Sequence, residues 1–175
     1  MTPKAVKLRI FPLVGDHIIP GRGFYQVEED SLYVQVGIFK TGQRYFSHLE
    51  SEFVHMEFDG SGQLIFIEVT LPRHRWSVNT NMKYPDEANM ADVRWLNFRE
   101  TISEPNITSN KSGTIVHLLF SSEKAENSFR IAENIYINTS VNKELISLWI
   151  TDIIDDKAGL ELAAFRHSCN HDDNS

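Results

Sequence analysis

The chain is poor in the residues that support disulfides, membrane spans and secretion. Cys169 is the single cysteine among 175 residues, so neither an intrachain disulfide nor a cysteine-based zinc site can form. No window approaches 18 apolar residues, which argues against a transmembrane helix. A charge or a proline interrupts every apolar run near the N-terminus, so no signal peptide is expected. These absences predict a cytoplasmic protein without a membrane partner.

Positive charge is also scarce. Lys and Arg contribute 17 side chains against 24 from Asp and Glu, which leaves a formal net charge of −7. Proteins that bind nucleic acid in general need a positive surface field. We therefore expect no nucleic-acid partner.

Motifs of catalysis and metal binding are missing as well. No Gly-x-Ser-x-Gly nucleophile turn occurs, and the segment 15–23 lacks the lysine and the following helix of a phosphate-binding loop. The acids Asp152, Asp155 and Asp156 lack the spacing of a calcium loop. We expect no cofactor and no bound metal, assign no catalytic residue, and favour a protein that is not an enzyme.

The stretch 53–69 has the pattern of a β-hairpin. Two runs of alternating apolar residues flank Asp59-Gly60-Ser61-Gly62, a sequence suited to a tight turn. Side chains alternate across a strand, so Leu64 and Phe66 are expected on the second face. The first, apolar face is expected to comprise Val54, Met56, Phe58, Ile65, Ile67 and Val69.

The rest of the chain also favours short strands over helices. Strands are expected at 5–14, 32–39, 45–49, 93–99, 114–120, 129–131, 135–139 and 145–151. Loops are expected at 15–23, 71–91 and 101–113, where Gly, Pro, Asn and Ser gather. The segment 158–166 fits either a short helix or a strand, and 167–175 reads as a mobile polar tail.

Two parts of the chain resemble each other. The segment 52–69 aligns without a gap on 133–150, and with a small shift 32–36 falls on 114–118 and Leu49 on Ile131. Any two hairpins can align on their apolar period, but ordered agreement over three strands favours an internal repeat. We expect an all-β fold of two related antiparallel β-meander repeats, packed as a sandwich or barrel-like unit.

This repeat divides a single domain, 1–175, into segments. The first half, 1–70, holds one repeat; 71–112 is a connection with one strand; 113–166 holds the second repeat; and 167–175 is the tail.

The first repeat resembles a family of small bacterial all-β meander modules of unknown function. The resemblance rests on Asp30-Ser31-Leu32-Tyr33-Val34 and on Asp59-x-x-Gly62-x-Leu64-Ile65-x-Ile67-Glu68-Val69. It covers 30–69 and, more faintly, 113–151, where the Asp and Gly are absent. The family implies a meander fold and no reaction.

Two groups of residues are candidate binding sites. His55 and Glu57 share one side of a strand, with His48 nearby, and could begin a metal or general-base site; the alternative is an exposed polar sheet face. Arg73, His74, Arg75 and Trp76 could hold a phosphate or stack on a ring. The alternative there is a strand-end cluster that pairs with Asp152, Asp155 or Asp156.

Large apolar residues on the second strand faces need a cover. They are Phe53, Leu64, Phe66, Tyr136 and Trp149. Since exposed apolar patches are uncommon on monomers, we expect either mutual cover by the two repeats or a homodimer or protein partner. The leading hypothesis is a non-enzymatic binding or interaction module. Alternatives are a small ligand-binding protein or hydrolase that uses His55, Glu57 and Arg73–Trp76, and an immunity-type protein that neutralises a partner.

Overall fold

The computed structural model describes residues 4–13, 15, 17–37 and 46–172. These residues form two β-sheets, the short 3-10 helix η1 (Arg73–Arg75) and the helix α1 (Leu160–Asp172). The larger sheet has, in spatial order, β1 (Leu8–Pro12), β8 (Asn89–Trp95), β12 (Asn127–Ala132), β13 (Ile135–Thr139), β14 (Leu145–Ile150), β11 (Val116–Leu119), β10 (Asn106–Ser109) and β7 (Ser77–Val78). The smaller sheet has β15 (Ile154–Asp156), β2 (Gly21–Gln26), β3 (Ser31–Val36), β6 (Leu64–Val69), β5 (Val54–Phe58), β4 (Ser47–Glu50) and β9 (Glu100–Thr101).

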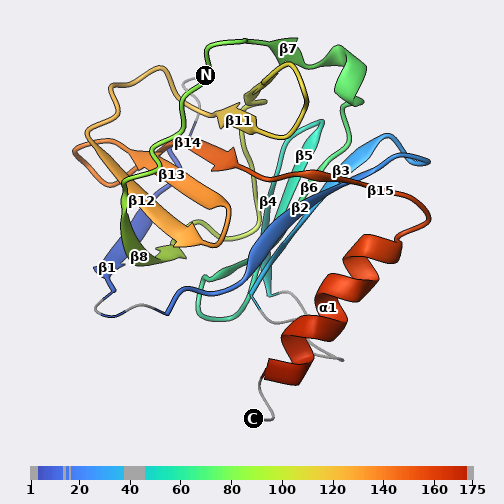
Figure 1. Ribbon diagram of the computed structural model, residues 1–175. Coiled ribbons are helices and arrows are strands. Elements are labelled where there is room, and N and C mark those ends of the chain that lie inside the picture. Colours follow the sequence, from blue (N-terminus) through green and yellow to red (C-terminus); the bar gives the residue numbers. More distant parts are fainter. Residues whose placement is uncertain (1–3, 14, 16, 38–45, 173–175) are drawn as a thin grey trace.

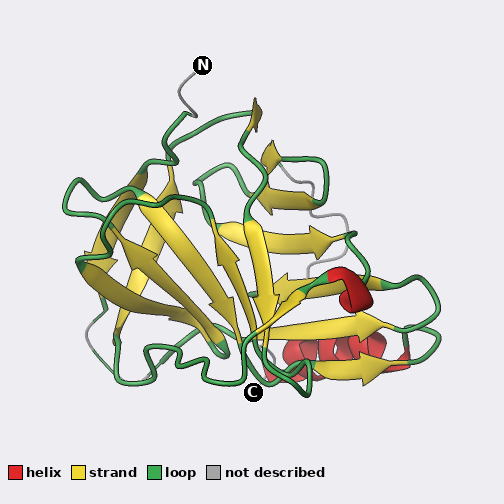
Figure 2. Ribbon diagram, turned by 90° about the horizontal axis from the view of Figure 1, so that it is seen from above, coloured by secondary structure: helices red, strands yellow, loops and turns green. Residues whose placement is uncertain are grey.

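The two sheets face each other and enclose one hydrophobic core (Figure 1). Ile67 of β6 and Leu148 of β14 are both fully buried in it. Helix α1 packs against the smaller sheet (Figure 2). Its Phe165 ring lies 5.4 Å from the ring of Phe24 in β2. The all-β prediction is therefore confirmed, with one short helix at the C-terminal end.

Both sheets share the same arrangement of seven strands. The order β7-β10-β11-β14-β13-β12-β8 in the larger sheet matches β15-β2-β3-β6-β5-β4-β9 in the smaller one. In each, five antiparallel strands are flanked at both ends by a parallel strand. Strand β7 follows β6 along the chain but joins the larger sheet, and β15 follows β14 but joins the smaller one. Each of these two strands thus pairs at the end of the sheet opposite to the one that holds the strand before it.

The central hairpins of the two sheets also share their register. Met56 lies opposite Ile67 in one, and Ile137 lies opposite Leu148 in the other. Each hairpin has an irregularity at the corresponding step, between Glu57 and Phe58 in the first and between Asn138 and Thr139 in the second.

The two hairpin turns have the same hydrogen bonds despite different sequences. The amide of Asp59 donates to the carbonyl of Gln63 at 3.0 Å, and the amide of Ser140 donates to the carbonyl of Glu144 at 2.9 Å. A side-chain oxygen of Asp59, and the hydroxyl of Ser140, each accept two backbone N–H groups within the turn. Gly62 and Lys143 both adopt a positive φ at the same position of the turn.

The strand order corrects two expectations about the repeats. β3 pairs with β6 and not with β4, and β11 pairs with β14 and not with β12, so neither unit is a simple meander. The pairing also places Leu32 opposite Val69 and Val116 opposite Ile150. Leu32 therefore corresponds to Val116, two residues beyond the alignment of 32–36 on 114–118.

Several expected loops contain strands. β2 begins at Gly21, inside the expected loop 15–23, because glycines allow close sheet packing there: a Cβ on Gly21 would lie 2.7 Å from the carbonyl oxygen of Glu133. The connection 71–112 was expected to hold one strand, but it holds four: β7, β8, β9 and β10. β15 was also not expected. β7, β9 and β15 have only two or three residues, and each is held by pairing with a distant strand at the edge of a sheet.

The C-terminal segment differs from the expected mobile tail. The ambiguous segment 158–166 is helical from Leu160 onward, and the helix continues to Asp172, whereas 173–175 lie outside the described residues. Cys169 lies in it and is buried.

The large apolar residues of the second faces are covered mainly from within the chain. Leu64 is buried in the core, because the irregularity beside Phe58 turns it inward and leaves Ile65 half-buried. The ring of His117 stacks on Trp149 at 4.0 Å, and Tyr84 of the 79–88 segment contacts Tyr136 at 5.1 Å. Phe66 contacts Tyr33 at 5.7 Å.

Candidate functional site

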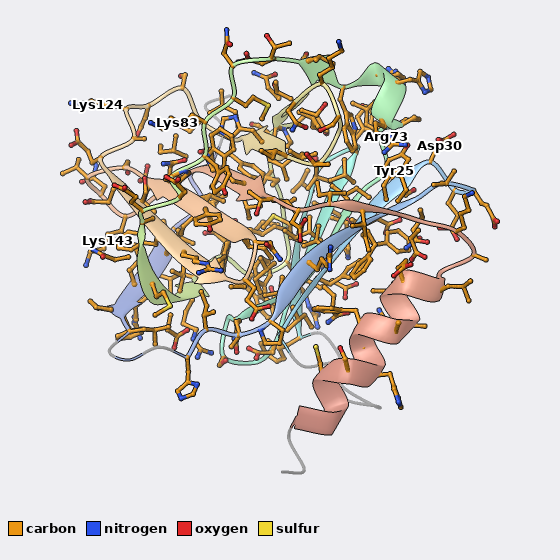
Figure 3. The ribbon with its side chains drawn as sticks, in the orientation of Figure 1. Tyr25, Asp30, Arg73, Lys83, Lys124 and Lys143 are labelled. Atoms are coloured by element: carbon orange, nitrogen blue, oxygen red, sulfur yellow. The ribbon has the colours of Figure 1, made fainter. Side chains whose placement is uncertain are left out.

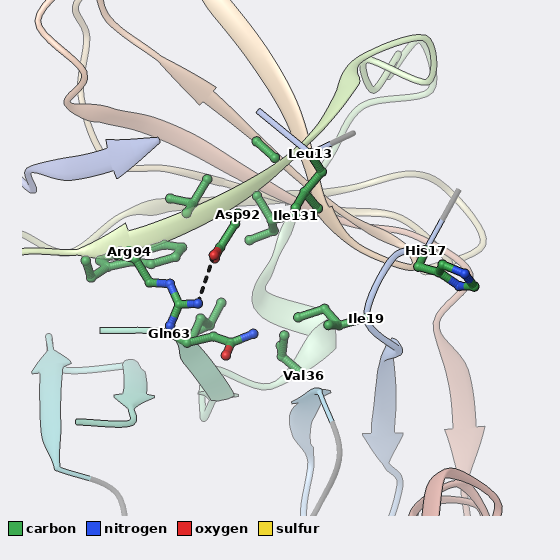
Figure 4. Close-up of a pocket in the computed structure, with 12 residues that line it drawn as sticks. Leu13, His17, Ile19, Val36, Gln63, Asp92, Arg94 and Ile131 are labelled. Carbon is green, nitrogen blue, oxygen red and sulfur yellow. Dashed lines mark hydrogen bonds and ion pairs between the residues drawn. The ribbon is translucent and has the colours of Figure 1, made fainter. Parts of the chain in front are cut away.

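The candidate site is a cavity of about 320 Å³ between the two sheets, which we call the first cavity. Strand β8 and Ile131 of β12 line it from the larger sheet, and Val36 of β3 and Leu64 of β6 line it from the smaller one (Figure 4). Its size falls in the range of small-molecule sites in proteins.

The first cavity is mostly apolar because β8 points alternate residues into the core. Ala91, Val93 and Trp95 are buried, whereas Asp92 and Arg94 are only half-buried. The other apolar lining residues are Leu13, Ile19, Val36, Leu64 and Ile131. An apolar molecule would find complementary walls here.

The polar residues gather at one part of the rim. Arg94 forms an ion pair with Asp92 at 2.8 Å and also donates to the hydroxyl of Ser61. In Figure 4 the guanidinium of Arg94 lies beside Gln63, whereas His17 lies apart from the others. The side-chain amide of Gln63 has no hydrogen-bond partner among the described residues. This rim therefore offers donors and acceptors with no net charge.

Trp95 adds a buried donor to the lining. The residue is 4% exposed, and its indole N–H has no acceptor among the described residues. A buried unpaired N–H is costly, so such groups often mark a missing water or ligand.

Three further hollows open on the described surface. The second cavity, about 370 Å³, is lined in part by Val6, Ile102 and Leu145. A third hollow lies beneath the segment 83–88 beside Asn138 and Trp149. A fourth lies beside Lys4, Asn97 and Glu100.

His55 and Glu57 lie on the outer face of β5, away from these four hollows. The Nε2 of His55 is 3.1 Å from Glu57, its Nδ1 is 3.5 Å from Glu50, and its ring stacks on His48. His48 is therefore near the pair, as expected. Within the described part of the chain, no group of three or more His, Cys, Asp and Glu residues is arranged to hold a metal ion.

Arg73 is engaged in contacts that hold the fold together (Figure 3). Its guanidinium donates to Asp155 at 2.6 Å and lies 4.1 Å from the centre of the Tyr25 ring. Its backbone N–H donates to the Tyr25 hydroxyl, which donates to Asp30 at 3.2 Å. Hydrogen bonding to Asp155 raises the pKa of Arg73 above its usual range. The expected pairing with an acid is thus present, through Asp155.

The neighbours of Arg73 do not form a shared pocket with it. Trp76 is 4% exposed, packs edge-on against Tyr25, and donates its indole N–H to the carbonyl of Leu71. His74 and Arg75 are exposed, and Arg75 lies 5.6 Å from the Phe53 ring. None of the six expected binding residues lines any of the four hollows.

Each acid near β15 has a separate partner. Asp152 pairs with Arg22 at 3.1 Å, and Asp155 pairs with Arg73. Asp156 is fully buried, where it accepts hydrogen bonds from Gln26 and from two backbone N–H groups at the start of α1.

Sequence reasoning missed the first cavity. Its lining comes from five separate segments, and only the alternation of Ala91, Asp92, Val93, Arg94 and Trp95 carried a signal. That alternation predicted a strand from 93 onward but could not show that its polar side reaches a cavity rim.

No helix in the described residues is long and apolar enough to cross a membrane. Neither a scan against protein-family models nor a search of curated proteins finds a match to this chain.

Proposed function

We propose that this protein is a non-enzymatic binding protein that takes a small, uncharged, mostly apolar molecule into the first cavity. The observation that carries the proposal is the combination of eight apolar lining residues with the paired rim charges of Asp92 and Arg94. The protein would act by holding its ligand, and we place it in the cytoplasm.

The walls favour an alkyl or ring body. Each methylene that leaves water contributes about 0.8 kcal/mol. A body of about eight carbons would therefore gain several kcal/mol, part of which offsets the loss of ligand freedom. We expect a dissociation constant between about 10 µM and 1 mM for such a simple ligand.

The rim favours an uncharged head group. Arg94 is neutralised by Asp92, so an anion would meet Asp92 and a cation would meet Arg94. Gln63 offers a further donor and acceptor without charge. A hydroxyl or amide can both donate and accept here, and it leaves no buried charge unpaired.

The test compares three ligands of equal chain length by titration, followed through the methyl NMR shifts of Leu64, Val93 and Ile131, which line the first cavity and not the second. 1-Octanol is expected to bind more tightly than octanoate and octylammonium. Asp92→Asn leaves Arg94 without its counter-charge, so the preference should move towards octanoate. Arg94→Gln leaves Asp92 alone, so the preference should move towards octylammonium.

His55→Gln is the matched control, because His55 lies on the outer face of β5. It should bind 1-octanol as the unmodified protein does. If 1-octanol does not bind, or if the two rim variants keep the original order of preference, the proposal is wrong.

We also infer that the two halves arose from one duplicated unit. The shared strand order, hairpin register and turn hydrogen bonds support this inference. Two unrelated hairpins would share an apolar period, but they would have no reason to share an irregularity at the same step.

We also propose that the protein forms a homodimer or binds a protein partner. The support for this proposal is an exposed apolar group formed by Phe46, Leu96 and Phe98, each about half exposed, with the rings of Phe46 and Phe98 5.2 Å apart. Sedimentation at micromolar concentration should show a dimer that Phe98→Ser weakens. A strict monomer would remove the homodimer from the proposal.

A further inference from the structure

The second cavity occupies the position in one half that the first cavity occupies in the other. Leu64 lies opposite Phe58 after the hairpin irregularity, and Leu145 lies opposite Thr139 at the same step. Gln63 lines the first cavity and Glu144 lines the second, each directly before that leucine.

The other walls correspond as well. Val36 follows Val34, which pairs with Ile67, and Phe120 follows Leu118, which pairs with Leu148. Val36 lines the first cavity and Phe120 lines the second.

The flanking parallel strands complete the correspondence. β8 lies beside β12 as β9 lies beside β4. That pairing sets Ala91 against Ile102, and both residues are buried and line their cavities. The two cavities therefore share at least four structural positions.

The charge at the shared polar position differs between the cavities. The neutral amide of Gln63 in the first cavity is replaced by the carboxylate of Glu144 in the second, and the two side chains have nearly the same shape. Glu144 is half-buried, and its carboxylate has no ion-pair or hydrogen-bond partner among the described residues.

The other charged groups of the second cavity leave it negative. Its lining includes Lys4, Glu123 and Glu144. The ammonium of Lys4 is bound by Glu100, outside this lining. Glu123 also has no cationic partner in the described residues. Lys7 lies opposite Glu144 across an isolated β-bridge, but its side chain forms no ion pair with Glu144 in the described residues. A ligand that enters the second cavity would therefore face carboxylates that are not bound in ion pairs.

We propose that the second cavity is a distinct binding site for a small apolar molecule with a primary ammonium group. Its apolar body would lie against Val6, Ile102 and Leu145, and its ammonium would donate to the carboxylate of Glu144. The proposal uses the same inter-sheet architecture as the first cavity, but it does not depend on a ligand being bound there.

The experiment uses the full chain, octylammonium as the probe, and a reciprocal pair of variants. In the unmodified protein, titration calorimetry should show one octylammonium bound per chain, with methyl NMR shifts at Ile102 and Leu145. Glu144→Gln should weaken this binding about tenfold, the effect of losing a charged hydrogen bond. Gln63→Glu should create a second octylammonium site, with new shifts at Leu64 and Ile131.

Both substitutions keep side-chain size, and the turn hydrogen bonds at 63 and 144 use backbone atoms. Unchanged far-ultraviolet circular dichroism and an unchanged urea midpoint would show that the fold is intact. Absence of octylammonium binding, equal binding by Glu144→Gln, or shifts confined to the first cavity would each overturn the proposal. Failure of 1-octanol to bind in the first cavity would contradict the proposed function and would leave the proposal for the second cavity unaffected.

Discussion

At the scale of single residues, the two hairpin turns require a positive φ at equivalent positions, and the residues there differ in the steric cost of adopting it. Gly62 has a φ of 82°, and Lys143 has a φ of 59°. Glycine adopts this conformation without steric cost, whereas a side chain there is strained by about 1–2 kcal/mol. The turn conformation is therefore less strained in the first hairpin, with Gly62, than in the second, with Lys143.

This difference predicts opposite effects of two substitutions. Gly62→Ala should destabilise the fold by about 2 kcal/mol or more, because a Cβ would lie 2.6 Å from the carbonyl oxygen of Trp95. Lys143→Gly should be neutral or stabilise it by up to about 1 kcal/mol. Urea unfolding of both variants measures these changes. Similar losses in the two variants would contradict the assignment of the turns.

His117 gives the fold a predictable pH dependence. Burial against Trp149 lowers the pKa of His117, so the folded state takes up its proton at lower pH than the unfolded state does. The contribution of His117 to stability is therefore present above about pH 6.5, the pKa of an unfolded histidine, and is lost as the pH falls below it.

Urea unfolding at about pH 7.5 and about pH 5.5 tests this sign. The unmodified protein should lose more stability on acidification than His117→Gln does. His74→Gln is the control, since His74 is exposed and its removal should leave the pH dependence unchanged. The account of His117 is wrong if both variants behave alike.

At the scale of elements, one buried carboxylate joins helix α1 to the smaller sheet. Asp156 ends β15, accepts the N–H groups of Glu161 and Leu162, and accepts a hydrogen bond from Gln26 of β2. Acceptors at a helix N-terminus satisfy N–H groups that would otherwise lack partners and interact favourably with the helix dipole.

Asp156→Ala should therefore destabilise the protein by about 2 kcal/mol or more, because a helix cap and a buried hydrogen bond are both lost. Asp152→Ala removes only a surface ion pair with Arg22 and should cost less than about 1 kcal/mol. Urea unfolding compares the two. Equal losses would show that Asp156 does not fasten the helix.

Equivalent residues on the inner faces of the two central hairpins should lose similar amounts of stability when they are truncated to alanine. Ile67 and Leu148 are fully buried and occupy the same position in the shared register. Ile67→Ala and Leu148→Ala should each destabilise by about 2–5 kcal/mol, as measured by urea unfolding. A near-zero loss at either position would contradict its place in the core.

Element prediction worked where apolar alternation was strong. β13 was expected at its observed bounds, and β14 was expected within one residue. The weak elements failed: β7, β10 and β15 are short, and their stability comes from pairing with distant strands. The face of Leu64 was misassigned because the hairpin irregularity shifts the alternation, and a period of two cannot reveal such a shift.

At the scale of the whole molecule, the exchange of β7 and β15 makes the two halves interdependent. β7 follows β6 of the smaller sheet but pairs at the edge of the larger one, β15 does the reverse, and the core is one continuous cluster. The sequence could indicate two similar units, but it could not show that they share strands. The two cavities are lined by residues from separate segments of the chain, which is why no local sequence motif predicted them.

Sequence spacing also could not show which candidate residues the fold brings together in a cavity. His55 and Glu57 were identified by spacing, and the structure places them on a solvated outer face, with Glu50 and His48 as neighbours. The first cavity instead combines residues from five segments. Only folding brings Val36, Arg94 and Ile131 together.

The most direct test of the central claim is a methyl-resolved NMR titration of the protein with 1-octanol. We expect saturable shifts at Leu64, Val93 and Ile131, which line the first cavity, together with intermolecular contacts between these methyl groups and the octyl chain. Shifts confined to other surfaces, or shifts that grow without saturation across the whole protein, would contradict a ligand site between the sheets.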